Sequence, residues 1–204
     1  MNFIPKIPLI AILRGITPKE VLAHAQVLVD TGFEMIEVPT NSPNWLESIQ
    51  LLQKEWGDRI LIGAGTVTQQ AYLDSLINCG GKLMVTPNTN PDLIRQAKLA
   101  GLQTYIGAFT PSEIYQAIDA GADVIKIFPC VGIDIAYIKA VRAIVPKQQA
   151  IYAVGGVTTQ NLYQFIEMGC QGAGLGSDLY CAGQSVEATK KAAEDFVRAW
   201  YEIN

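Results

Sequence analysis

A lysine inside a run of apolar residues is the feature of this sequence best suited to chemistry. Lys126 stands within the segment 123–129, where branched and aromatic residues predict a buried β-strand. Side chains alternate between the two faces of a strand, so Val124, Lys126 and Phe128 share one face. Burial favours the neutral amine, which can attack a carbonyl carbon to form a Schiff base. The alternative is a structural lysine whose stem lies on apolar surface while its ammonium reaches water.

A carboxylate stands in a second apolar run. Glu37 lies within the segment 35–38, and if it shares an interior with Lys126, burial raises the pKa of the acid and lowers that of the amine. Such a pair can move protons beside an imine, or it can be a buried ion pair with no turnover. Arg14 follows the first apolar run and offers a planar fork for a carboxylate, although it could equally cap a loop or neutralise Glu37.

These residues must be positioned by the fold, and the sequence repeats one unit along its length: a short apolar run followed by a segment with helical periodicity. We predict eight strands: Ile7–Leu13, Met35–Val38, Leu61–Ala64, Leu83–Thr86, Gln103–Ile106, Asp123–Phe128, Ala150–Val154 and Gly172–Leu175. Nearly continuous apolar strands separated by helices indicate a parallel sheet, and eight such units close a barrel. The sequence therefore predicts an α/β protein with a single (β/α)8 TIM barrel over residues 1–204. The rival is a doubly wound open sheet, but no G-x-G-x-x-G turn follows the first strand.

Glycine and proline mark the ends of the predicted helices. Glycines at the ends of helices predict left-handed caps at Gly32, Gly80, Gly101, Gly121 and Gly169. Prolines at the first helical position are expected at Pro18, Pro43, Pro91 and Pro111.

A closed barrel locates its active site at the carboxyl ends of the strands. Thr66 follows the third strand and either contacts a ligand or caps the next helix. Gly155 and Gly156 follow the seventh strand, and Gly176 and Ser177 follow the eighth, where barrels frequently bind phosphate through backbone N–H groups. Each pair could also be an ordinary turn.

Composition excludes several other classes of function. A formal charge of −4 and scattered Lys and Arg residues argue against nucleic-acid binding. Four cysteines without paired spacing and a single histidine argue against a zinc site. We expect His24 on a helix surface and Cys130 in packing. No run approaches the ~20 apolar residues of a membrane span, and no signal peptide is evident, so a cytoplasmic protein is expected.

The ordered motifs of this chain resemble those of one family nearly from end to end. They are Leu9-Ile-Ala-Ile-Leu-Arg-Gly15, Glu37-Val-Pro-Thr-Asn-Ser-Pro43, Ile62-Gly-Ala-Gly-Thr-Val67, Val85-Thr-Pro-Asn88, Ile125-Lys-Ile-Phe-Pro129, Ala153-Val-Gly-Gly-Val157 and Gly174-Leu-Gly-Ser-Asp-Leu179. This set closely resembles the 2-keto-3-deoxy-6-phosphogluconate and 6-phosphogalactonate aldolases.

The resemblance implies a metal-independent class I aldolase that needs no cofactor and is usually a homotrimer. Such an enzyme splits a phosphorylated six-carbon keto acid into pyruvate and glyceraldehyde 3-phosphate. The implied roles are Lys126 as the Schiff-base lysine, Glu37 as the general acid/base, Arg14 and Thr66 at the carboxylate end of the substrate, and Gly155, Gly156, Gly176 and Ser177 at its phosphate.

Val154 bears on the choice of substrate within the family. The gluconate enzymes typically carry threonine directly before the paired glycines, so Val154 is similar to the galactonate branch. A hydroxyl can hydrogen-bond one orientation of the substrate 4-hydroxyl, and a valine cannot. The alternatives are the gluconate epimer as main substrate, a phosphosugar epimerase or isomerase with Glu37 as base and no covalent intermediate, and a phosphate-ligand sensor without catalysis.

Overall fold

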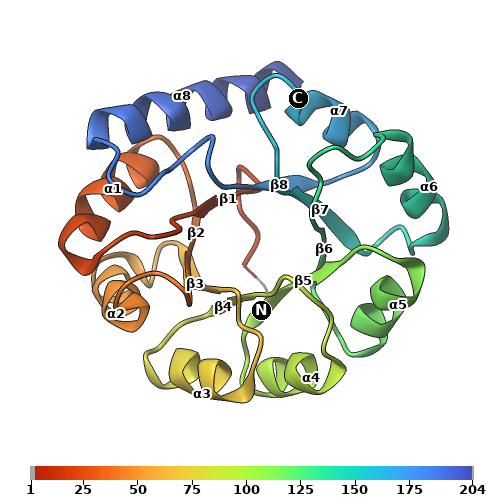
Figure 1. The fold of residues 1–204 in the computed structure, drawn as a ribbon, viewed down its shortest axis with the longest axis horizontal. Helices are drawn as coiled ribbons and strands as arrows, with labels where there is room; N and C mark the ends of the chain where they lie inside the picture. The colour runs from red at the N-terminus through yellow and green to blue at the C-terminus, as the bar shows by residue number, and fades with distance from the viewer. Residues whose placement is uncertain (1–2, 204) are drawn as a thin grey trace.

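Eight parallel strands close into a barrel in the computed structural model, which describes residues 3–203 (Figure 1). Each strand pairs in parallel with the next, and β8 returns to β1 with Leu9 opposite Ala173. The strands are β1 Leu9–Ile12, β2 Met35–Pro39, β3 Leu61–Gly65, β4 Leu83–Val85, β5 Gln103–Ala108, β6 Val124–Ile127, β7 Ala150–Val154 and β8 Gly172–Leu175. The prediction of a (β/α)8 TIM barrel is confirmed.

A helix follows every strand and lies on the outside of the barrel (Figure 1). The helices are α1 Pro18–Asp30, α2 Trp45–Trp56, α3 Gln70–Asn78, α4 Pro91–Leu99, α5 Pro111–Asp119, α6 Ala136–Ile144, α7 Leu162–Glu167 and α8 Val186–Ile203. Among residues 3–203, none of these helices combines the length and the apolar character that crossing a bilayer requires.

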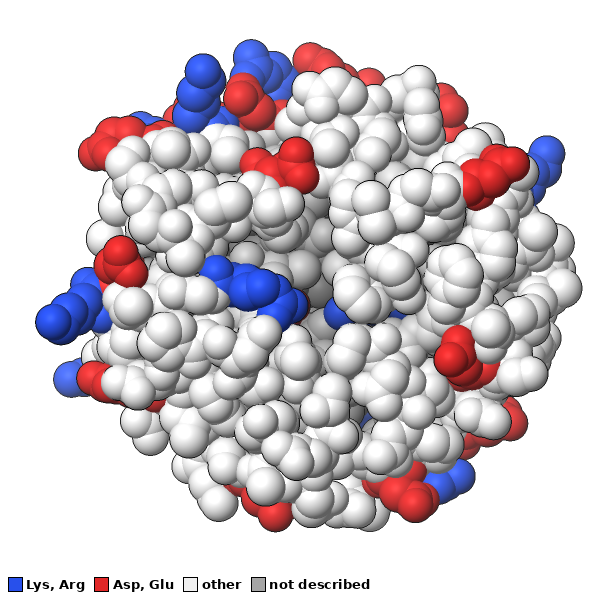
Figure 2. Space-filling view, in the orientation of Figure 1, with Lys and Arg blue, Asp and Glu red and all other residues white. Residues whose placement is uncertain are grey.

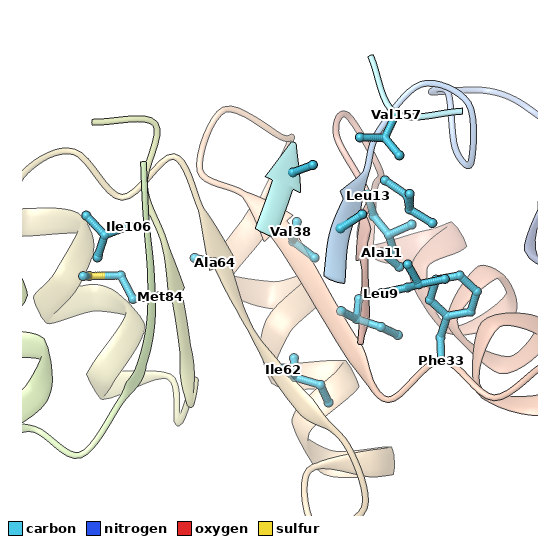
Figure 3. Close-up of a cluster of buried hydrophobic side chains, with 14 of the residues drawn as sticks. Leu9, Ala11, Leu13, Phe33, Val38, Ile62, Ala64, Met84, Ile106 and Val157 are labelled. Atoms are coloured by element: carbon cyan, nitrogen blue, oxygen red, sulfur yellow. The ribbon is translucent and has the colours of Figure 1, made fainter. Parts of the chain in front are cut away.

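The two faces of the strands supply two separate apolar clusters, as alternation requires. Inward residues such as Ile10, Tyr105 and Val124 fill the barrel. Outward residues join side chains of the helices in a larger core, part of which is shown in Figure 3 around Leu9 and Ile62. Because both faces are covered, the strands read as continuous apolar runs in the sequence.

The predicted glycine caps are confirmed, and the prolines are confirmed in three places of four. The five glycines have φ values between +80° and +110°, which side chains with a Cβ rarely adopt. Pro18, Pro91 and Pro111 open their helices. The expectation for Pro43 is wrong, because α2 begins two residues later. The Ser42 amide donates to the Pro39 carbonyl and the Ser42 hydroxyl accepts from the Gly15 amide, and this turn delays the helix.

The expectation for His24 is also wrong, and that for Cys130 is confirmed. His24 is 2% exposed, because α1 packs against α8 as well as on the barrel, and its Nδ1 lies 2.8 Å from Thr189 Oγ1. Its spacing from Val21 and Leu28 puts it on the apolar stripe of α1, a signal that composition statistics overlook. Cys130 is buried in the outer core, and burial raises its pKa to about 11.

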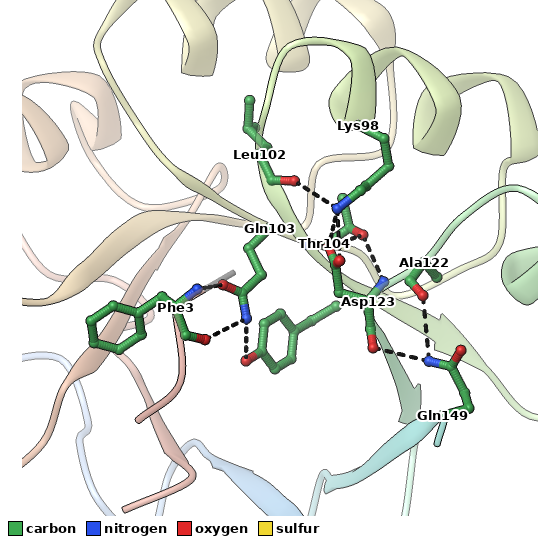
Figure 4. A network of polar contacts seen from close by, with 9 residues as sticks. Phe3, Lys98, Leu102, Gln103, Thr104, Ala122, Asp123 and Gln149 are labelled. Atoms are coloured by element: carbon green, nitrogen blue, oxygen red, sulfur yellow. Dashed lines mark hydrogen bonds and ion pairs between the residues drawn. The ribbon is translucent and has the colours of Figure 1, made fainter. Parts of the chain in front are cut away.

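The amino end of the barrel is held by a polar network around Asp123 (Figure 4). Asp123 Oδ2 accepts from Lys98 Nζ at 2.6 Å, from the Thr104 amide at 2.8 Å and from the Thr104 hydroxyl at 3.0 Å. Gln149 Nε2 donates to the Asp123 carbonyl. The network therefore connects α4 and β5 to the amino ends of β6 and β7, and β6 is the strand that carries Lys126.

The N-terminal arm covers this end of the barrel. The Phe3 amide donates to Gln103 Oε1 at 3.0 Å, and Gln103 Nε2 donates to the Phe3 carbonyl at 3.1 Å (Figure 4). The Phe3 side chain packs against the interior cluster.

We expect Asp123→Ala to lower the free energy of unfolding by about 3 kcal/mol, because it removes the acceptor of two donors on Thr104 and the charged partner of the Lys98 ammonium, which keeps a long contact of 3.4 Å with the Leu102 carbonyl. Urea denaturation measures this change. The matched control is Asp92→Ala, which removes an exposed ion pair with Arg95 and should cost under about 0.5 kcal/mol. Equal losses of stability in the two variants would contradict the conclusion that the Asp123 network stabilises the barrel.

Candidate active site

A cavity of about 330 Å³ lies at the carboxyl ends of the strands, and it gathers all the predicted site residues. They are Arg14, Glu37, Thr66, Lys126, Val154, Gly155, Gly156, Gly176 and Ser177. Figure 2 shows basic side chains at a hollow in the centre of this face, and the two basic residues that line the cavity are Arg14 and Lys126. Residues from seven of the eight strands or the loops after them thus meet in one place.

Lys126 lies inside the barrel on β6. Its neighbours Ile125 and Ile127 belong to the outer core, and Lys126, only 6% exposed, lines the cavity. Its Nζ lies 4.6 Å from the centroid of the Phe128 ring. The pKa of Lys126 is lowered to about 8. Burial is the main cause of this shift, the charge of Arg14 adds to it, and the opposite charge of Glu37 counteracts it. About a tenth of the amine is therefore uncharged at pH 7, far more than for an exposed lysine.

Glu37 lies inside the barrel on β2 and is 2% exposed. Its carboxyl group occupies the space in front of Gly65, where an added Cβ would lie 1.4 Å from Glu37 Oε2. Among residues 3–203, Glu37 Oε2 has no hydrogen-bond partner although it is buried. Burial raises the pKa of Glu37 to about 7, against the opposing charges of Lys126 and Arg14. The group can thus hold or release a proton near neutral pH.

The amine and the carboxyl group face one cavity without touching. In the described part of the chain, neither Lys126 nor Glu37 forms an ion pair within 4.0 Å. A buried structural ion pair would show direct contact and satisfied oxygens. The two groups instead border the same cavity, where a ligand could contact both of them.

Arg14 and Thr66 stand at the rim of the cavity. Arg14 Nη1 donates to Asn41 Oδ1 at 2.7 Å, which orients the guanidinium from the loop after β2. Thr66 has a left-handed φ of 61°, an unusual value for a β-branched residue. The helix-cap interpretation of Thr66 is wrong, because α3 begins at Gln70 and is preceded by Gln69. Strained residues of this kind cluster at functional sites.

Two glycine turns, after β7 and after β8, complete the lining of the cavity. Gly155 and Gly156 have φ values of 94° and 75°, and both lie directly after Val154. A Cβ on Gly176 would meet nothing within 4 Å, so the main chain there borders open space. Turns of this type can direct backbone N–H groups toward an anion.

The cavity is also lined by residues to which the sequence assigned no role. They are Ile12, Pro87, Phe128, Val157 and Asp178, of which Pro87 and Asp178 lie at expected strand ends. Phe128 could have been found, because it shares a strand face with Lys126. The requirement for glycine at position 65 could not be predicted from the local sequence. It arises because the Glu37 carboxyl group, on the neighbouring strand, fills the space that a side chain at position 65 would occupy.

The comparisons with known proteins agree with one another. The model of the KDPG and KHG aldolase family matches residues 1–194. A curated 2-dehydro-3-deoxy-6-phosphogalactonate aldolase of Escherichia coli K12 is 50% identical over 99% of this chain and 98% of its own. A solved structure described as native KDPGal has a TM-score of 0.97, with 49% identity over 100% of this chain and 98% of its own. A porous cage designed by fusing symmetric oligomeric domains has a TM-score of 0.95, with 50% identity over 97% of this chain and 73% of its own.

We expect Lys126 to be acylated by a small reagent with a pH midpoint near 8, because burial depresses the pKa of its amine. Glu37→Gln should lower this midpoint, since it removes the negative charge that favours the ammonium. Arg14→Gln should raise the midpoint, since it removes a like charge. Mass spectrometry of the peptide that contains Lys126, sampled across pH, gives the three curves. A midpoint near 10.5, or shifts of the opposite sign, would exclude the arrangement described.

Proposed function

The chain belongs to the KDPG and KHG aldolase family, and we propose that it cleaves 2-dehydro-3-deoxy-6-phospho-D-galactonate into pyruvate and D-glyceraldehyde 3-phosphate through a Schiff base. The observation that carries this proposal is the buried, partly uncharged amine of Lys126, which shares one cavity with the protonatable carboxyl group of Glu37. The identity to the Escherichia coli enzyme supports the choice of substrate.

The proposed reaction begins when Lys126 Nζ attacks the C2 ketone of the substrate. Glu37, acting through a water, supplies and removes the protons needed to form the carbinolamine and expel water from it. The resulting iminium draws electrons as the C3–C4 bond breaks and the C4 hydroxyl loses its proton to the same relay. The aldehyde leaves, the enamine gains a proton at C3, and hydrolysis of the imine releases pyruvate and the free lysine.

The cavity offers a different kind of anchor at each end of the substrate. We assign the carboxylate end to the Arg14 guanidinium and Thr66, because the guanidinium fork matches a carboxylate. We assign the phosphate to the turns at Gly155, Gly156, Gly176 and Ser177. Backbone amides there can bind the anion while the positive charge stays near the reacting carbon.

Val154 is the residue that we propose to set the preference at C4. It is 4% exposed, lines the cavity and lies directly before the paired glycines. A valine gives no hydrogen bond to either orientation of the 4-hydroxyl, whereas a threonine would favour one of them.

We propose that the protein works as a metal-independent homotrimer in the cytoplasm, without a cofactor. The similarity to a cage built from symmetric oligomeric domains supports an oligomer. Phosphorylated sugar acids carry several charges and do not cross bilayers unaided, so an enzyme that cleaves them is expected on the side where they are made. The net charge of −4 supports small molecules rather than nucleic acids as partners.

A pyruvate-release assay on both 4-epimers, run side by side, tests this function. We expect the galactonate epimer to have the higher kcat/KM, and we expect Val154→Thr to raise the relative kcat/KM for the gluconate epimer about two- to tenfold, the range of one hydrogen bond. Lys126→Ala is the control and should release no pyruvate above background. Faster cleavage of the gluconate epimer by the wild type would overturn the substrate assignment. Interconversion of sugar phosphates without pyruvate would indicate an epimerase or isomerase.

A further inference from the structure

The loop between β8 and α8, residues 176–185, is held on the side away from the cavity by a chain of polar side chains, one half-buried and two buried. Gly176 and Ser177, at the start of the loop, line the cavity. At the end of the loop, outside the cavity, Gln184 Nε2 donates to the Leu179 carbonyl at 2.9 Å and to Thr189 Oγ1 at 2.6 Å. Gln184 Oε1 accepts from the Cys181 amide at 2.9 Å. The whole side-chain amide of Gln184 is thus engaged in holding the loop.

His24 continues this chain into the body of the protein. Its Nδ1 lies 2.8 Å from Thr189 Oγ1, and its ring meets the Tyr180 ring edge-on with centroids 5.0 Å apart. Thr189 is fully buried on α8 and His24 is nearly so on α1. A buried imidazole and hydroxyl cost free energy unless they are paired, and here they pair with each other and with the loop.

The loop also packs against the neighbouring loop, after β1, that carries Arg14. A Cβ added to Gly15, which has a φ of +83°, would lie 3.0 Å from Ala182 Cβ. Inside the loop, the amides of Leu179 and Tyr180 both donate to the Gly176 carbonyl at 2.9 Å. Any displacement of the Leu179–Gln184 segment is therefore transmitted to Gly176 through these two hydrogen bonds.

We propose that His24, Thr189 and Gln184 are positioning residues that fix the Gly176–Ser177 turn in place to bind the phosphate of the substrate. None of the three lines the cavity, so they act through the loop and not on the substrate. The inference rests on the proposed function, because it assigns the phosphate to this turn. It predicts a defect confined to the phosphorylated end of the substrate, while the chemistry at Lys126 proceeds as before.

The test compares two reactions of the full-length protein. Thr189→Val keeps the shape of the side chain but removes the hydroxyl, and it should raise KM for the phosphorylated keto acid about three- to tenfold with kcat within twofold of the wild type. Thr189→Ser restores the hydroxyl and should restore KM. Pyruvate carries no phosphate, so exchange of its methyl protons with D2O, which needs the Lys126 enamine and proton transfer but no phosphate contact, should proceed at the wild-type rate in both variants.

The controls separate this proposal from the function on which it rests. Thr31→Val removes a threonine hydrogen bond at the far end of α1 and should leave KM unchanged. If Thr189→Val fails to fold, Gln184→Ala, at a half-buried position, replaces it in the test. We expect the same rise in KM for the phosphorylated keto acid, with kcat nearly unchanged. An unchanged KM, or equal losses of cleavage and of pyruvate exchange, would overturn the positioning role. Absence of exchange in the wild type would instead overturn the Schiff-base function.

Discussion

The burial of one amine and one carboxyl group in the same closed barrel is the constraint on which the rest of the structure depends. Removing both groups from water moves their pKa values toward each other, to about 8 for Lys126 and about 7 for Glu37. Direct contact would restore both charges and make a structural ion pair. The two groups instead lie on β2 and β6 without an ion pair within 4.0 Å among residues 3–203, so both protonation states remain accessible near neutral pH.

The surrounding chain supplies what such a pair requires. Gly65 leaves the space that the Glu37 carboxyl group occupies, and the Phe128 ring lies beside the lysine amine. The Asp123 network ties together the strands below Lys126, which limits the freedom of its backbone. Rigid strands thus hold the two proton-carrying groups, while the loops after the strands hold the anchors for the ends of a ligand.

The sequence predicted most of the fold and the membership of the cavity, because strand alternation and helix-end residues are local signals. The lysine strand, for example, is recognisable from its own seven residues. The failures concern features that depend on distant partners. His24 lies on an apolar stripe whose partner is α8, and Thr66 adopts a left-handed conformation instead of capping α3. The role of Gly65 depends on a carboxyl group of the neighbouring strand, so no local pattern could reveal it.

The central claim is that the uncharged amine of Lys126 forms a covalent imine with a keto acid. Its most direct measurement is reduction with borohydride in the presence of pyruvate, followed by mass spectrometry of the peptides. Our account predicts one adduct, on Lys126, that requires pyruvate and is absent from Lys126→Ala. An unmodified wild-type chain, or an adduct that persists in Lys126→Ala, would contradict it.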